Sequence, residues 1–322
     1  MESILIFGPN VAETLVEDIT TELRRRYGHD VVSVPVTWRA FTDGESTLRL
    51  DGNVRGRDTY VIQSTNAPGN LMAMKLLLQA ANLASAGRLT AVIPYFGYGR
   101  QDRKDQPRTP ITAKLVAREI EAAMGVSQPR HVVLVHPHFS QLQGFFDIPS
   151  DVLFPTEEFV GVISKLDTGG KPLVFVAADI GGVKQADVFA KRLKTPMAIV
   201  HKRRDPTTGE LGEATVIGDV RGYACIVVDD MFDTCGTLRH AAVALCEAGA
   251  ASVYACATHG IFSGPAVERI AAAPVQQIIV TDTLPQVDGG FSGRVRTIGC
   301  GKLIATAIWC DNTDNSLSSL TV

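Results

Sequence analysis

The segment from Ala224 to Gly249 constrains the fold most, because its pattern predicts a strand, a short loop and a helix in direct succession. Residues 224–228 are apolar and rich in β-branched side chains, which indicates a buried strand with Asp229 and Asp230 at its end. The loop 233–237 consists of small and hydroxyl-bearing residues, and residues 238–248 favour a helix that Gly249 closes.

The same loop has the properties of an anion-binding site. Backbone N–H groups at a helix N-terminus point toward a bound anion, and the helix dipole adds a favourable potential. Thr234 and Thr237 can each offer a hydroxyl group to one phosphate, whereas Asp229 and Asp230 suit a sugar diol or a divalent metal ion. Together these groups describe a site for a ribose 5-phosphate unit. A plain turn and helix cap would not need two acids after an apolar strand.

Strand and helix patterns alternate along the rest of the chain. Strand-like runs lie at 3–7, 90–94, 131–135, 173–177 and 253–258, and helical patterns lie at 12–27, 70–84, 113–124 and 184–193. This order predicts an α/β protein with doubly wound parallel sheets. Because 322 residues exceed the usual size of a single core, we expect two domains, 1–150 and 151–322, with a crossing near 149–155. The last helix, near 303–309, could return to the first domain.

Composition argues against several functional classes. A net charge of −3 does not suit a general nucleic-acid or membrane-surface binder. No apolar run is long enough to span a bilayer and no signal peptide precedes the first strand, so we expect a cytoplasmic protein. The six cysteines form no C-x-x-C pair, which predicts reduced and mostly buried thiols.

Other polar stretches follow predicted strands, where α/β sheets place their ligand loops. Residues 95–108 pass from glycine and aromatic residues to closely spaced Arg and Lys, which suit a polyphosphate. His138 follows the strand 131–135 and either binds a metal-phosphate group or caps the strand. Gly181 and Gly182, after Asp179, permit close approach of the backbone to a ligand. Residues 41–45 are typical of a hairpin tip.

With these stretches combined, the chain resembles the phosphoribosyl diphosphate (PRPP) synthetases, or ribose-phosphate diphosphokinases, over nearly its full length. The resemblance rests on residues 41–45, 92–104, 140–146, the Asp179 loop, the Asp229 loop and 258–265. It implies two doubly wound parallel-sheet domains of phosphoribosyltransferase-like type. It also implies Mg²⁺-dependent transfer of the β,γ-diphosphoryl group of ATP to the C1 hydroxyl of ribose 5-phosphate, with AMP as the other product.

The resemblance further assigns roles to individual residues. The adenosine part of ATP would contact Phe41, Asp43 and Glu45, often supplied by a neighbouring subunit, with Phe41 stacked on the base. Other contacts to ATP would come from Arg100, Gln101 and Asp102. His138 would approach the metal-triphosphate, and Asp179 would act at the metal and ribose. Asp229 and Asp230 would hold the ribose hydroxyls, and the 5-phosphate would be cradled by Asp233, Thr234, Cys235, Gly236 and Thr237.

Lys202 and Arg204 match the mobile catalytic loop of the family. Their charges also fit the chemistry, since diphosphoryl transfer builds negative charge that nearby cations stabilise. An effector site for phosphate or ADP is implied at Arg55, Arg108, Ser316 and Ser318, although scattered surface polarity would look the same.

Two departures from the family pattern leave alternatives open. His136 stands where the family usually has Asp, and Gln185 replaces a common Arg. An active synthetase is the favoured function. A catalytically weak or inactive regulatory homologue is the second, and a PRPP-using phosphoribosyltransferase, which the ATP-like stretches argue against, is the third. A shared ATP site predicts a homo-oligomer, commonly a hexamer in this family.

Overall fold

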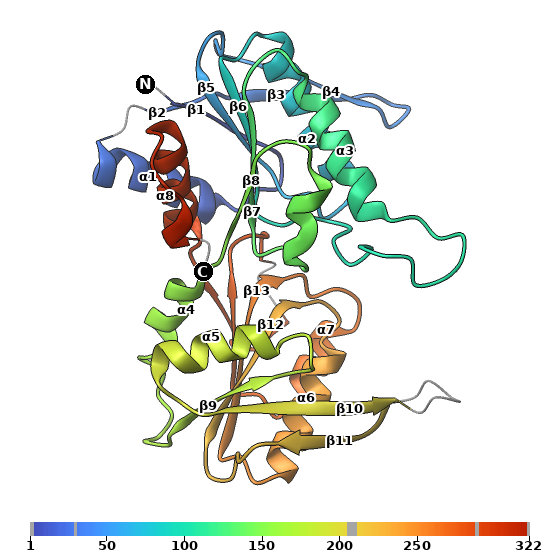
Figure 1. Ribbon diagram of the computed structural model, residues 1–322, viewed down its shortest axis with the longest axis vertical. Coiled ribbons are helices and arrows are strands. Elements are labelled where there is room, and N and C mark those ends of the chain that lie inside the picture. Colours follow the sequence, from blue (N-terminus) through green and yellow to red (C-terminus); the bar gives the residue numbers. More distant parts are fainter. Residues whose placement is uncertain (1–2, 29–30, 205–210, 287–289, 321–322) are drawn as a thin grey trace. The chain divides into compact units, whose positions relative to one another are not determined.

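The computed structural model describes residues 3–28, 31–204, 211–286 and 290–320 (Figure 1). The chain forms two compact units. Unit 1 comprises Met1–Pro155, Thr283–Pro285 and Gly299–Val322, and unit 2 comprises Thr156–Asp282 and Gln286–Ile298. Each unit is built around its own sheet, and none of the helices that the structure describes combines the length and apolarity needed to cross a bilayer.

Unit 1 contains a parallel sheet in the order β2-β1-β5-β6-β7-β8. Its strands are β1 (Ser3–Phe7), β2 (Val31–Ser33), β5 (Asp58–Ile62), β6 (Arg88–Ile93), β7 (Arg130–Val135) and β8 (Ser150–Leu153). Its α-helices are α1 (Glu13–Tyr27), α2 (Pro68–Leu83), α3 (Thr112–Met124) and α8 (Gly301–Asn312). Short 3-10 helices cover Ser140–Phe145 and Ser318–Leu320, and β3 (Val36–Ala40) and β4 (Ser46–Leu50) form a separate antiparallel hairpin.

Helices cover both faces of this sheet, and alternate residues of each strand supply the two cores. In β7, Val132 and Leu134 pack with α2 and α3, whereas Val133 and Val135 pack with α1 and α8. A strand buried on both faces must be apolar almost throughout, which explains the runs seen in the sequence. The prediction of a doubly wound parallel sheet is confirmed for this unit.

Unit 2 repeats the plan with the strand order β11-β10-β9-β12-β13-β14-β15. Its strands are β9 (Leu173–Ala177), β10 (Met197–Arg204), β11 (Leu211–Ile217), β12 (Ala224–Phe232), β13 (Ser252–Gly260), β14 (Gln277–Thr281) and β15 (Val295–Ile298). Among the strands that the structure describes in this sheet, β11 alone runs antiparallel to its neighbour. One core includes α4 (Thr156–Ile163) and α5 (Val183–Leu193), and the core on the other face includes α6 (Gly236–Glu247) and α7 (Ala266–Ala272).

Three elements differ from the sequence predictions. The strand expected to end at Val228 continues to Phe232, so Asp229 and Asp230 lie inside β12. Backbone pairing causes this extension, since Asp229 still pairs with Ala257 of β13 and Phe232 with Gly260. Residues 150–153, where a crossing between domains was suggested, form β8 beside β7. Helix α7 was not predicted, because seven residues are too few to show helical periodicity.

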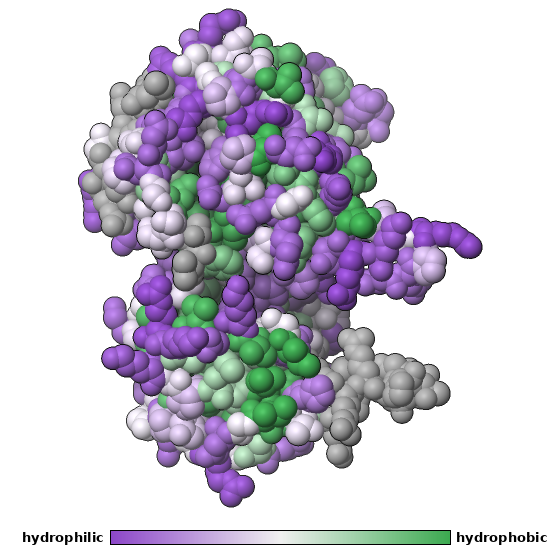
Figure 2. All heavy atoms as spheres, viewed as in Figure 1, coloured by the Kyte–Doolittle hydropathy of each residue, from purple (hydrophilic) through white to green (hydrophobic). Residues whose placement is uncertain are grey.

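Hydrophilic side chains cover much of the face seen in Figure 2, and apolar side chains gather in smaller groups. The most exposed large apolar side chains include Val126, at 86%, and Leu83, at 73%. Single exposed apolar residues are normal on a protein surface, so we assign no role to them.

Candidate active site

The predicted ribose 5-phosphate residues run from β12 through the following loop into α6: Asp229 and Asp230 lie in β12, Asp233, Thr234 and Cys235 in the loop, and Gly236 and Thr237 in α6. Helix α6 begins at Gly236, and Cys235 precedes it with a left-handed backbone, φ 56°. The first N–H groups of a helix have no partner within the helix, so they are available to an anion. The hydroxyl groups of Thr234 and Thr237 are exposed and have no hydrogen-bond partner among the described residues. The loop therefore offers both kinds of donor that a phosphate requires.

The segment after β13 forms hydrogen bonds with this loop. The Ser263 hydroxyl donates to the Asp233 carboxylate, and Nη1 of Arg269 donates to the Thr234 carbonyl at 3.0 Å. The backbone N–H of Ile261 also donates to the Phe232 carbonyl at 2.9 Å. Asp233 thus holds the loop in place through its own side chain, a role that its position in the sequence did not reveal.

The carboxylate of Asp229 in β12 is influenced by two others, those of Asp230 beside it and of Asp179 in the loop after β9. Burial raises the pKa of Asp229, the adjacent Asp230 raises it further, and Asp179 adds to the effect from the loop after β9. The N–H of Asp230 donates to Oδ1 of Asp229 at 3.0 Å. Oδ1 of Asp179 accepts a bond from the N–H of Gly182 at 3.2 Å, which turns the paired-glycine loop back on this acid. The structure therefore brings Asp179 together with the ribose residues.

Oxygen donors of this kind suit Mg²⁺, which binds through one or two carboxylates and completes its shell with substrate phosphates and water. Within the described ranges, no three His, Cys, Asp or Glu side chains converge as a metal site. The donor chemistry thus fits a hard cation that takes its remaining ligands from a substrate.

All six cysteines are free, and only Cys246 is exposed. Burial, with a smaller contribution from Asp233, raises the pKa of Cys235 to about 12. Its thiol is therefore uncharged at neutral pH and is a poor nucleophile. This agrees with a loop that binds a phosphate through N–H and hydroxyl groups.

In unit 1, residues 41–45 form the tip of the β3–β4 hairpin, as the sequence predicted. Phe41 donates its N–H to the Glu45 carbonyl at 2.8 Å, and the Asp43 carboxylate accepts the Glu45 N–H at 3.0 Å. The Phe41 side chain is 40% exposed, and the Arg39 guanidinium carbon lies 4.9 Å from the centre of its ring. An exposed ring beside a cation is a suitable surface for a nucleobase. Sequence reasoning did not identify Arg39.

The other predicted ATP residues lie on two neighbouring loops of unit 1. A Cβ atom added to Gly99 would lie 3.6 Å from Cβ of His138, so the loop carrying Arg100 and Asp102 adjoins His138. Arg100 and His138 are exposed and Asp102 is half-buried. Gln101 accepts a hydrogen bond from the Thr112 hydroxyl at 2.6 Å, which ties it to the start of α3.

His136 has a different environment from His138. It is buried, has a φ of 41°, and its ring lies edge-on to Phe154 with 5.0 Å between ring centres. The departure from the family's Asp therefore lies in the packed interior at the end of β7.

The structure describes the backbone of the two predicted catalytic residues but not their side chains. Lys202 and Arg204 lie near the C-terminal end of β10, and the pairing with β11 shifts register between them. Their side chains lie outside the described part of the chain.

The four predicted effector residues belong to unit 1. The hydroxyls of Ser316 and Ser318 are 2.9 Å apart, the N–H of Arg55 donates to the Asn53 side chain, and Arg108 has a φ of 70°.

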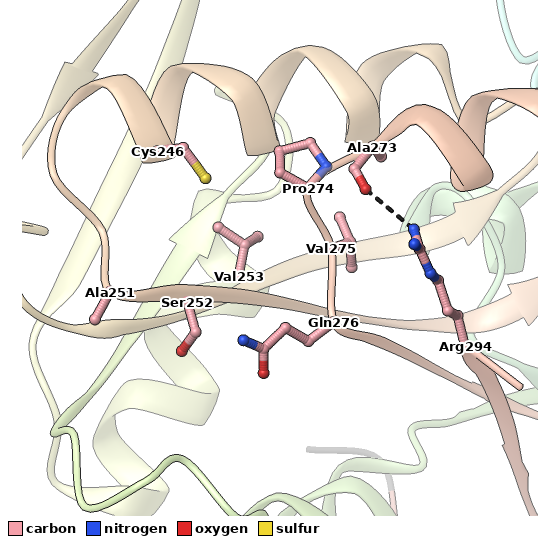
Figure 3. A pocket seen from close by; sticks show the side chains of 9 residues that line it. All are labelled: Cys246, Ala251, Ser252, Val253, Ala273, Pro274, Val275, Gln276 and Arg294. Carbon is pink, nitrogen blue, oxygen red and sulfur yellow. Dashed lines mark hydrogen bonds between the residues drawn. The ribbon is translucent and has the colours of Figure 1, made fainter.

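A separate pocket of about 370 Å³ lies in unit 2, where β13 and β14 begin (Figure 3). Its lining includes Cys246, Ser252, Val253, Gln276 and Arg294. None of the predicted site residues lines it. Parallel sheets bind ligands where their strands end, so this pocket is distinct from the candidate active site.

Comparison with known proteins gives consistent matches. Residues 4–124 match the N-terminal domain of ribose phosphate pyrophosphokinase, and residues 207–321 match the phosphoribosyl synthetase-associated domain. A ribose-phosphate pyrophosphokinase of Hyphomonas neptunium is 46% identical over 286 residues, which cover 88% of this chain and 90% of the relative. The protein of the same name from Cereibacter sphaeroides is 42% identical, over a match that covers 99% of this chain and 94% of the relative.

A solved structure gives the same result. The crystal structure of phosphoribosylpyrophosphate synthetase from Mycobacterium smegmatis matches with a TM-score of 0.87 and 34% sequence identity. The match covers 98% of this chain and 100% of that chain. It confirms the α/β class and the phosphoribosyltransferase-like character of the sheets.

Proposed function

The chain belongs to the ribose-phosphate pyrophosphokinase family, and we propose that it makes PRPP and AMP from ribose 5-phosphate and ATP. The diphosphoryl group would pass from ATP to the C1 hydroxyl of the sugar. The observation that carries the proposal is the β12–α6 loop. There, hydroxyls that have no hydrogen-bond partner in the described ranges, together with helix N–H groups, follow a pair of carboxylates. This combination suits a phosphate and a sugar diol on one substrate.

Each group has a distinct task in this proposal. The N–H groups of 233–237, with the hydroxyls of Thr234 and Thr237, hold the 5-phosphate. Asp229 and Asp230 accept hydrogen bonds from the ribose hydroxyls and so fix the orientation of the sugar. Fixing the sugar removes much of the entropic cost of bringing its C1 hydroxyl into reacting position.

The ATP side of the proposal rests on the unit 1 residues and two cations. Phe41, Asp43 and Glu45 would hold adenosine, and the triphosphate would meet Arg100, Gln101, Asp102 and His138. Lys202 and Arg204 would stabilise the negative charge that builds on the attacked phosphate and on departing AMP. When bound, Mg²⁺ would neutralise phosphate charge, with Asp179 as an oxygen ligand and His138 beside the metal-bound phosphates.

Several finer statements belong to the same proposal. We expect a homo-oligomer, of hexamer size, whose ATP site includes the β3–β4 hairpin of a neighbouring subunit. Phosphate and ADP would act at Arg55, Arg108, Ser316 and Ser318. The reaction would take place in the cytoplasm.

The proposal is tested by incubating the purified chain with ribose 5-phosphate, ATP and Mg²⁺ and separating the products by chromatography. We expect AMP and PRPP in equal amounts. Lys202→Ala should lower the rate by roughly a hundredfold or more, because a charge that stabilises the transition state is lost. Lys171→Ala, at an exposed lysine of the same unit, serves as the matched control and should leave the rate unchanged.

The two alternative functions predict different outcomes in this assay. A regulatory homologue would bind ribose 5-phosphate or ATP without turnover, and a phosphoribosyltransferase would consume added PRPP. Either result would overturn the proposed activity.

A further inference from the structure

Arg269 lies against the middle of the ribose-phosphate loop, although it comes from a different helix. It belongs to α7, and its Nη1 donates to the Thr234 carbonyl at 3.0 Å. A Cβ atom added to Gly236 would lie 3.2 Å from the same Nη1. The guanidinium therefore bonds to Thr234 and lies beside Gly236, the two residues that flank Cys235.

No carboxylate among the residues that the structure describes neutralises the charge of this side chain. Arg269 is half-buried and forms no ion pair with the residues that the structure describes. A guanidinium carries several N–H donors, and the Thr234 carbonyl is the only hydrogen-bond partner found for them in the described ranges. Nε and Nη2 therefore remain available, at a place where the N-terminus of α6 already favours an anion.

The position of α7 does not depend on this contact. Nη1 of Arg294 donates to the carbonyls of Ile270, Ala271 and Ala273, which closes the C-terminal end of α7. Ala266 and Ile270 are buried in the core of unit 2. The structural requirement for α7 is thus met by other residues, and the guanidinium of Arg269 is directed to the loop.

We propose that Arg269 is a positioning residue for ribose 5-phosphate, which fixes the loop through Thr234 and adds its charge to the phosphate site. This inference rests on the proposed function and deepens it. A guanidinium pairs with a phosphate through parallel N–H bonds and so favours a phosphate monoester over an uncharged sugar. Arg269 would therefore contribute to the preference for ribose 5-phosphate over ribose.

The test compares wild type with Arg269→Gln, Arg269→Lys and the control Arg296→Gln, which removes an exposed charge from β15 of the same unit. Titration calorimetry measures binding of ribose 5-phosphate and of ribose, and steady-state assays give KM for each substrate. Arg269→Gln should weaken binding of ribose 5-phosphate by at least about tenfold, the usual loss for one charge-assisted bond. Arg269→Lys should restore part of that loss.

Other readouts separate this role from a structural one. KM for ATP, binding of ribose and the thermal unfolding midpoint should change little in Arg269→Gln, and Arg296→Gln should match wild type throughout. An unchanged affinity for ribose 5-phosphate in Arg269→Gln, with an active wild type, overturns the inference and leaves the proposed function intact. Equal losses for ribose 5-phosphate, ribose and ATP would also overturn it, since they indicate general damage. A wild type that binds ribose 5-phosphate but forms no PRPP contradicts the proposed function alone.

Discussion

At the scale of a single residue, the environment of Asp229 disfavours its negative charge, so this residue relates substrate binding to stability. Burial, Asp230 and Asp179 all raise its pKa. A carboxyl whose pKa is raised on folding destabilises the folded state at any pH where it ionises. We therefore predict that Asp229→Asn raises the free energy of unfolding at pH 8 while it weakens binding of ribose 5-phosphate.

The pH dependence gives the sign of this effect. At a pH below the ordinary pKa of Asp, 3.8, the carboxyl is protonated in both states and the substitution should change stability little. The gain should grow as the pH rises above 3.8 and should level off above the raised pKa of the folded state. Urea unfolding at pH 5 and pH 8 measures it, with Glu268→Gln, at an exposed acid, as the control. A gain that shrinks toward high pH would contradict the assignment.

Residue types and their order predicted the polar groups of the loops well. Thr234 lies in the loop before α6 and Thr237 in its first turn, as the strand–loop–helix pattern indicated, whereas Asp229 and Asp230 lie inside β12 and not after it. Arg269 was missed because it acts on residues distant in sequence. Arg39, two residues before Phe41, was missed because single cations are common on protein surfaces. Only the folded backbone brings Arg269 to Thr234, whereas Arg39 and Phe41 are close because alternate residues of an extended segment share a face.

Among the elements, α8 shows how a segment from the end of the chain joins the sheet of unit 1. Asp311 of α8 accepts a hydrogen bond from Tyr60 at 2.9 Å and contacts Nδ1 of His131 at 3.0 Å. Nε2 of His131 lies 2.9 Å from Asp151 of β8, and Arg88 bonds to the Asp311 carbonyl. These contacts join β5, β6, β7 and β8 to one helix.

The charges of this network predict a pH-dependent attachment of α8. Burial lowers the pKa of His131, but Asp311 and Asp151 outweigh it and raise the pKa above 6.5. Burial raises the pKa of Asp311, but His131, Tyr60 and Arg88 outweigh it and lower the pKa below 3.8. The network therefore stabilises most between about pH 4 and pH 6.5, and the contribution of His131 declines as the pH rises through its folded-state pKa.

The prediction is that His131→Gln lowers the free energy of unfolding by about 1–3 kcal/mol at pH 6, because a buried charged partner is lost. The difference from wild type should be smaller at pH 8.5. Trp309 of α8 reports local unfolding by fluorescence once Trp38 is replaced by Phe, since the chain has two tryptophans. Lys302→Gln, on the exposed side of α8, is the control. Equal losses at both pH values would show that the charge of His131 does not contribute.

Element types were predicted more accurately than element ends. Apolar runs and helical periodicity identified the long helices and the central strands, because burial on both faces of a sheet leaves a strong signal. Strand β12 was predicted too short, since pairing with β13 holds polar residues in extended conformation as readily as apolar ones. Strands β8 and β15, of four residues each, and helix α7 are too short to show a period.

At the scale of the whole molecule, the proposal of a shared ATP site predicts that two inactive variants restore each other. The hairpin β3–β4 is largely exposed and presents Phe41 at its tip. In the proposed oligomer, one subunit supplies this hairpin and its neighbour supplies Lys202. Phe41→Ala and Lys202→Ala chains, each nearly inactive alone, should form some fully wild-type sites when their subunits are exchanged.

Random mixing of equal amounts should restore about a quarter of the wild-type activity, since each site draws its two parts independently from a closed symmetric assembly. Native mass spectrometry must show mixed oligomers, and mixing each variant with itself provides the baseline. Restored activity near this level would establish that hairpin and catalytic loop act in trans. If mixed oligomers form without recovery, both parts of each site come from one chain, and Phe41 serves its own subunit.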